Sequence, residues 1–166
     1  MRNLYLVLAL FIYVGTAAAE EPQALFTIKS LTPEFAEKAA NAALLSCRKA
    51  GFQVTVAVVD RGGHLQVLLR DQLAGYLTLK AAELKAQTAA SFRTNSGDIA
   101  EATFNNKELS GIRHEPGLLA LAGGVMIQAG GELVGAIGVA GAPQSKSDEK
   151  CAKSGVEAIQ EQLDFN

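Results

Sequence analysis

The sequence predicts an α+β fold, a largely antiparallel sheet of about five strands flanked by helices. Two glycine-centred segments carry this prediction, Val54–Leu65 and Gly123–Val139. Each fits two strands joined by a tight turn, at Gly62-Gly63 in the first segment and at Gly130-Gly131 in the second. Helical patterns lie before, between and after the two hairpins, which favours antiparallel pairing with helices packed on the sheet.

The chain before the first hairpin is expected to form one helix. Thr32 suits the N-cap position and Pro33 suits the first turn, so the helix should begin there and run to about Lys49. Gly51 ends it as a capping glycine. The apolar stripe of this helix is expected to comprise Phe35, Ala39, Ala42 or Ala43, and Leu45.

The first hairpin supplies two strands of different character. Residues 53–59 are apolar on both faces, which is typical of a strand in the centre of a sheet. In residues 64–70 one face is aliphatic, whereas the other includes His64, Gln66 and Arg70. A half-polar face of this kind indicates an edge strand or a binding site.

The middle of the chain contains the clearest helical pattern, from Tyr76 to Phe92. A 4-3-4 spacing places four residues on the face expected to be buried: Leu77, Ala81, Leu84 and Thr88. Ser96 or Asp98 can cap a short helix over residues 99–105.

The rest of the chain completes the sheet. Residues 107–116 are polar and irregular, and residues 118–121 are compatible with a short strand. Strands over 125–128 and 132–139 form the second hairpin. A last helix over 147–163 is expected to turn three residues inward, namely Val156, Ile159 and Leu163.

Residues 1–19 are expected to be a signal peptide. Arg2 supplies the positively charged n-region of such a peptide, and Leu4–Val14 supplies its apolar core. Ala17-Ala18-Ala19 fits the small-residue pattern of a cleavage site. The apolar run is shorter than the roughly 20 residues of a membrane span, although an uncleaved anchor is the alternative. Residues 20–166 then form a single domain, located in the periplasm or outside the cell.

The charge of the chain argues against a nucleic-acid partner. The formal net charge is −2 at pH 7, and loss of Arg2 with the signal peptide makes it more negative. No membrane attachment is expected after cleavage. No group of residues has the spacing of a structural metal site.

The two cysteines, Cys47 and Cys151, are expected to form a disulfide in an exported chain. If strand 53–59 pairs antiparallel with strand 132–139, the start of the first lies beside the end of the second. If the first and last helices cover the same face of that sheet, the C-terminal end of the first meets the N-terminal end of the last, which brings the two sulfurs together. Two buried free thiols are the alternative.

Several segments together resemble the GlcG/HbpS family, the haem-degrading or haem-binding domain family that includes the C-terminal domain of PduO-type proteins. The resemblance covers the whole mature chain and rests on the order and spacing of short motifs. The matching motifs of the first half are Val58-Val59-Asp60, Gly63-His64-Leu65, Arg70-Asp71, Lys85-Ala86 and Thr88-Ala89. Those of the second half are Gly123–Ile127, Gly130-Gly131, Val134–Val139, and Asp148-Glu149 followed by Ala152.

The resemblance implies a profilin-like α-β sandwich, haem as the ligand of secreted members, and a homo-oligomer. The small residues of the last strand, Ala136, Gly138 and Ala140, would allow another subunit or an element of the same chain to approach closely. Two positions depart from the family pattern, since Ala140 stands where Ser is expected and Met126 where Pro is expected.

Haem iron needs a His, Met, Tyr or Cys ligand, and the chain has two histidines. His64 is the first candidate iron ligand, with Arg70 as a partner for a haem propionate. His114, in a loop, is the second candidate. Tyr76 is a further candidate. The alternative for each histidine is a solvated surface residue.

Three functions remain open at this point. The first is an exported haem-binding protein, an accessory to haem or iron uptake or to redox sensing. The second is an enzyme acting on haem or on a small organic acid. The third is a small-molecule sensor domain without haem. Lys85 could serve a Schiff-base or acid/base role, although a solvated helix lysine beside Glu83 is the simpler interpretation.

Overall fold

The computed structural model describes residues 23–165, so the expected signal peptide lies outside the described residues. The described part of the chain forms four α-helices, one 3₁₀ helix and four strands. The helices are α1 (Pro33–Lys49), α2 (Leu77–Phe92), α3 (Ser96–Asn105), η1 (Ser110–His114) and α4 (Ser145–Asp164). The strands are β1 (Thr55–Asp60), β2 (Leu65–Arg70), β3 (Gly124–Ala129) and β4 (Glu132–Ala140).

The four strands form one antiparallel sheet in the order β2-β1-β4-β3. The predictions of a central first strand and an edge second strand are therefore confirmed. The expected count of about five strands was one too high in this part of the chain, because residues 118–121 do not join the sheet. The Leu119 N–H donates to Thr88 Oγ1, and the Leu121 N–H donates to the Leu119 carbonyl within a tight turn.

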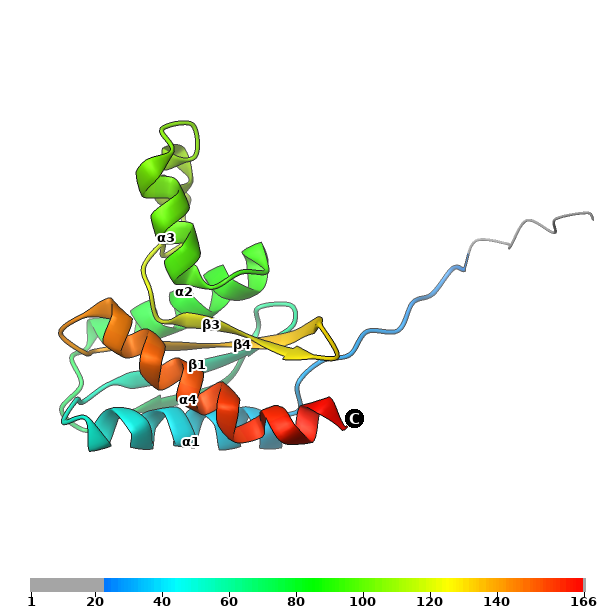
Figure 1. Ribbon diagram of the computed structural model, residues 1–166, viewed down its shortest axis with the longest axis horizontal. Helices are drawn as coiled ribbons and strands as arrows, with labels where there is room; N and C mark the ends of the chain where they lie inside the picture. The colour runs from blue at the N-terminus through cyan, green and yellow to red at the C-terminus, as the bar shows by residue number, and fades with distance from the viewer. Residues whose placement is uncertain (1–22, 166) are drawn as a thin grey trace, which may run out of the picture.

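The helices cover the sheet from both sides. In Figure 1, α1 and α4 lie side by side against one face, and α2 crosses the other face with α3 beyond it. The main core lies between the sheet and the α1–α4 layer, where Val56, Ile137 and Ile159 are buried. The fold is thus the α-β sandwich that the resemblance implies.

The α2 layer lies unusually close to the sheet. A Cβ added at Gly138 of β4 would collide with the carbonyl of Ala82, and one at Gly124 of β3 would collide with the carbonyl of Lys85. Only small residues fit such a contact, so alanines and not leucines turn toward the sheet. The buried residues of α2 are Ala82, Lys85, Ala86, Thr88, Ala89 and Ala90.

The expected apolar stripe of α2 was therefore wrong in part. Thr88 is buried, but Leu77 is 78% exposed. In α1 the prediction also erred at one position, because Leu45 is 52% exposed while Leu44 is buried. Apolar spacing identified both helices but misplaced part of their buried faces. In α2 the reason is the close contact with the sheet, which selects alanine over leucine.

The small residues of β4 are used within the chain. Ala136 packs with Ala86 and Ala89, and Ala140 packs with Ala82. The element that these residues allow to approach is therefore α2 of the same chain. They leave no close-approach surface on β4 for a second subunit.

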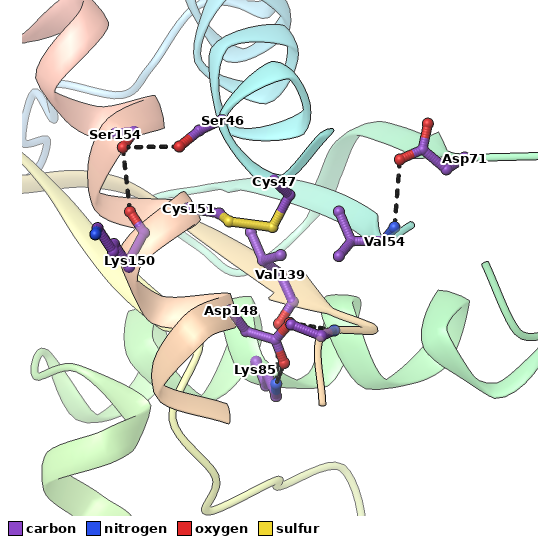
Figure 2. Close-up of a disulfide and its surroundings, with 11 residues drawn as sticks. Ser46, Cys47, Val54, Asp71, Lys85, Val139, Asp148, Lys150, Cys151 and Ser154 are labelled. Carbon is purple, nitrogen blue, oxygen red and sulfur yellow. Dashed lines mark hydrogen bonds and ion pairs between the residues drawn. A yellow bond between two sulfur atoms is a disulfide. The ribbon is translucent and has the colours of Figure 1, made fainter. Parts of the chain in front are cut away.

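The predicted disulfide is confirmed. Cys47, near the end of α1, is bonded to Cys151, in the first turns of α4, with a Cα–Cα distance of 5.5 Å (Figure 2). The register supports the argument that predicted it, because Thr55 at the start of β1 pairs with Ala140 at the end of β4. The bridge closes a loop of 104 residues and ties the two helices of one layer together.

Candidate functional site

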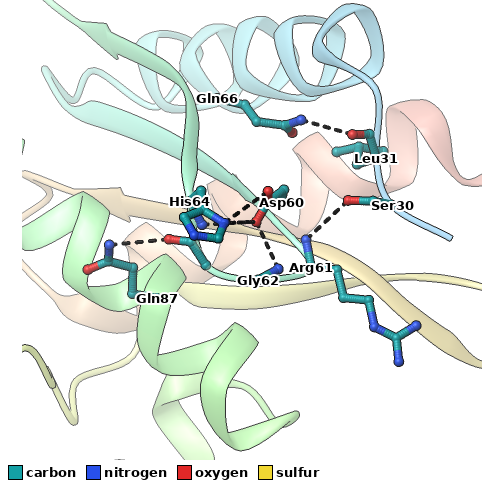
Figure 3. A network of polar contacts seen from close by, with 9 residues as sticks. Ser30, Leu31, Asp60, Arg61, Gly62, His64, Gln66 and Gln87 are labelled. Carbon is teal, nitrogen blue, oxygen red and sulfur yellow. Dashed lines mark hydrogen bonds and ion pairs between the residues drawn. The ribbon is translucent and has the colours of Figure 1, made fainter. Parts of the chain in front are cut away.

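The turn between β1 and β2 holds His64 in a defined orientation. The carboxylate of Asp60 accepts hydrogen bonds from the backbone N–H groups of Gly62 and His64, at 2.8 and 2.9 Å. It also lies 3.2 Å from Nδ1 of the His64 ring (Figure 3). A Cβ on Gly62 would lie 2.9 Å from that ring, so glycine there lets the imidazole fold back onto Asp60.

The Asp60 contact fixes the chemistry of the imidazole. A carboxylate beside Nδ1 favours the tautomer with the proton on Nδ1, which leaves the lone pair of Nε2 available. Within residues 23–165 no hydrogen-bond partner faces Nε2, and the side chain is 82% exposed. An oriented imidazole of this kind is the arrangement that metal-binding histidines use.

The pKa of Asp60 agrees with its role as the hydrogen-bond acceptor that orients His64. Partial burial raises the pKa of the Asp60 carboxyl, but hydrogen bonds from His64 and Gly62 outweigh burial and hold it below the ordinary value. Asp60 is therefore ionised at neutral pH, as an acceptor for the Nδ1–H group must be.

Arg70 lies at the opposite end of β2 from His64, so the structure does not bring the two together. A strand of six residues spans roughly 20 Å. The Arg70 guanidinium donates to the carbonyls of Ala74 and Gln72 and braces the loop after β2. Tyr76 follows this loop at the start of α2 and is 82% exposed.

His114 lies at the end of η1, ten residues before β3 begins, and is exposed. Its neighbour Arg113 carries the polar contacts of this segment, donating to Thr103 Oγ1 and to the carbonyl of Ala100. The predicted site residues therefore occupy three separate places: the β1–β2 turn, the loop that leads into α2, and η1.

Sequence reasoning missed a second polar feature, centred on Lys85. The Lys85 side chain is only 1% exposed, which overturns the interpretation of a solvated helix lysine. Its ammonium lies 2.7 Å from Asp148 Oδ2 and donates to the Val139 carbonyl at 2.9 Å (Figure 2). Asp148 Oδ1 accepts the N–H of Ala142. Burial lowers the pKa of Lys85, and the Asp148 carboxylate opposes that shift only in part.

Lys85 also forms part of the wall of a cavity of about 670 Å³. The cavity lies between the first turns of α2 and the β4–α4 loop, and Ala140, one of the departures from the family pattern, lines it. The only sequence signal for this site was that Lys85 and Asp148 each stand in a short motif that resembles the family. Neither residue pattern nor spacing indicated that the two would meet.

Residues 23–165 contain neither a metal-binding cluster nor a membrane-spanning helix. They hold no group of three or more His, Cys, Asp or Glu side chains placed to bind a metal ion. Among their helices, none is both long enough and apolar enough to cross a membrane.

Fold and site together define a small α-β sandwich domain with an oriented, exposed histidine and a separate cavity lined in part by Lys85 and Asp148. The chain belongs to the HbpS-like family of haem-degrading proteins, whose family model matches residues 31–157. Protein GlcG of Escherichia coli strain K12 is 33% identical over 92 residues, 55% of this chain and 67% of GlcG. Haem is accordingly a candidate ligand.

Solved structures agree with this assignment. A double mutant of HbpS from Streptomyces reticuli is 38% identical, with a TM-score of 0.78 over 86% of this chain and 95% of that one. The haem complex of PduOC is 22% identical, with a TM-score of 0.72 over 78% of this chain and 95% of that one. At that identity the second match supports the fold alone.

Proposed function

We propose that this protein is an exported haem-binding protein and that His64 would bind the haem iron. The observation that carries the proposal is the Asp60–His64 contact, which orients the ring and leaves Nε2 without a described partner. Membership in the HbpS-like family supports haem as the ligand. A bound haem would supply an iron centre for redox or oxygen chemistry.

Haemin titration of single variants tests the ligand. We expect His64→Ala to weaken haemin binding and shift the Soret band, whereas the matched change His114→Ala leaves both as in the wild type. Asp60→Asn keeps the imidazole but removes its orienting carboxylate, so affinity should fall by about 10–100-fold. An unchanged spectrum and affinity in His64→Ala would exclude ligation by this residue.

The proposed role is an accessory to haem or iron uptake, or to redox sensing. Because the matching family is described as haem-degrading, turnover is the alternative activity. Addition of a reductant to the haem-loaded protein separates the two. A Soret band that shifts on reduction but keeps its intensity indicates binding alone, and progressive loss of the Soret band indicates degradation.

Export to the periplasm or the medium is part of the same proposal. Its support is the signal-peptide pattern of residues 1–19 and the Cys47–Cys151 bridge, a bond that persists in oxidising compartments. The intact mass of the secreted protein should correspond to a chain that begins at Glu20. Retention of Met1 in that protein would contradict cleavage after Ala19.

We further propose that the protein is a homo-oligomer. His64 is too exposed for one chain to enclose a haem bound to it, so a second subunit would have to cover the other side of the ring. The open edge strand β2, with Leu65 and Leu68 exposed, is an available contact surface. Light scattering at micromolar concentration should give a multiple of the chain mass, and a monomer mass would refute this proposal.

A further inference from the structure

We propose that the cavity beside Lys85 binds a small carbonyl compound, an aldehyde or a ketone, and that the Lys85 amine captures it as a reversible imine. This site is separate from the proposed haem site. Lys85 hydrogen-bonds to the last part of β4, where Val139 and Ala140 lie, whereas Asp60, which holds His64, pairs with Gly135 at the other end. Five residues of extended strand separate the two ends by roughly 17 Å.

The geometry leaves one position on the Lys85 nitrogen for a ligand. An ammonium group has three N–H donors. Within residues 23–165, Lys85 uses one for the Val139 carbonyl and one for Asp148. The third position has no described partner, and Lys85 is among the residues that line the cavity. As the carbon–nitrogen bond forms, a carbonyl compound in the cavity would replace the contact with Asp148 on the nitrogen, while the hydrogen bond to the Val139 carbonyl can remain.

Burial makes it easier for Lys85 to give up a proton and form the neutral amine that attacks a carbonyl. Buried lysines lose their proton more readily than exposed ones, which is why they serve as Schiff-base residues. Burial lowers the pKa of Lys85 in this way, and Asp148 lies 2.7 Å away to accept the proton.

The proposed reaction is balanced without an oxidant or a reductant. Lys85 Nζ adds to the carbonyl carbon, and a nitrogen-bound proton and the carbonyl oxygen become the hydroxyl of a carbinolamine. Asp148 then donates a proton to that hydroxyl, which leaves as water while the C=N bond forms. The remaining proton on nitrogen returns to Asp148 or stays on the imine nitrogen.

The cavity limits the size and character of the ligand. A volume of about 670 Å³ lies within the range of small-molecule sites. Leu77, Ala81 and Leu121 provide apolar wall, and Lys146 adds a positive charge at the α4 side. A short carbonyl compound with or without a carboxylate group fits these features better than a polycation or a large polar ligand.

Reductive trapping tests the proposal on the whole mature protein. The protein is incubated with acetaldehyde or with pyruvate, reduced with sodium borohydride, and analysed by intact mass and by peptide mapping. We expect one reduced adduct per chain, located on Lys85. Comparison of the two probes shows whether the carboxylate of pyruvate adds to capture.

Two lysine-to-arginine variants serve as a matched pair. Lys85→Arg keeps the charge but cannot form an imine, so the adduct should be lost; Lys80→Arg changes an exposed lysine of the same helix and should leave the adduct unchanged. Peptide mapping of the wild type locates the adduct even if Lys85→Arg fails to fold. Absence of an adduct on Lys85, or equal labelling of exposed lysines, would overturn the proposal. Haemin titration of Lys85→Arg should match the wild type, which separates this test from that of the haem site.

Discussion

Gly138→Ala is expected to destabilise the protein by about 3 kcal/mol or more, because the added methyl group has no space between β4 and α2. Its Cβ would overlap the carbonyl of Ala82 and lie 2.7 Å from the backbone nitrogen of Ala86. Backbone atoms in the middle of a helix cannot rotate away as a side chain can. The whole helix would have to withdraw from the sheet, which would open the contacts of Ala82, Ala86 and Ala89.

Urea unfolding followed by circular dichroism measures this effect. Gly111→Ala is the matched control, because nothing lies within 4 Å of the position its Cβ would take. The control should change the free energy of unfolding by less than about 1 kcal/mol. Equal unfolding midpoints for Gly138→Ala and Gly111→Ala would show that α2 is not held as close to the sheet as described.

The sequence allowed most of the fold to be predicted, because its signals are local. The glycine turns at 62–63 and 130–131 and the apolar segments beside them define four strands. The helix ends follow from residues such as Pro33 and Gly51. The disulfide followed from these elements once antiparallel pairing of strand 53–59 with strand 132–139 was assumed, a pairing that the structure contains.

The orientation of helix faces was harder to predict. Apolar periodicity assumes that the largest apolar residues are buried, and Leu77 and Leu45 violate that assumption. In α2 the deciding interaction is the contact with Gly138 and Gly124, which lie more than 30 residues away in the sequence. No pattern within the helix reveals that the strands against it carry glycine at the two contact positions.

The candidate site was predictable only in part. His64 was identified as a turn residue, but its contact with Asp60 depends on how the turn folds back. The partnership of Lys85 with Asp148 spans 63 residues and joins two helices on opposite faces of the sheet. A buried lysine has no local signature, because a lysine on a solvated helix face looks the same in sequence.

Asp148→Asn is expected to destabilise the protein by about 3–5 kcal/mol at neutral pH, because it leaves the buried Lys85 without a counter-charge. Asparagine Oδ1 can still accept the N–H of Ala142, as Asp148 Oδ1 does. Its amide group, however, would present N–H donors to the Lys85 ammonium. The substitution therefore keeps the shape of the side chain and removes mainly the charge.

The loss of unfolding free energy caused by Asp148→Asn should depend on pH in a defined direction. Burial already lowers the pKa of Lys85, and loss of the Asp148 carboxylate, which opposes that shift, lowers it further. The unfolded lysine then binds a proton over a wider pH range than the folded one. Stability rises with pH wherever the unfolded state binds more protons, so the penalty should be smaller at about pH 9 than at about pH 7.

Urea unfolding at both pH values, with Glu83→Gln as the control, measures this prediction. Glu83 pairs with Lys80, whose side chain is 64% exposed, so the same carboxylate-to-amide change there should cost less than about 1 kcal/mol at either pH. A penalty for Asp148→Asn as small as that of the control would mean that Lys85 is neutral or hydrated in the folded protein. A penalty that grows with pH would contradict the assignment of the effect to an uncompensated Lys85 charge.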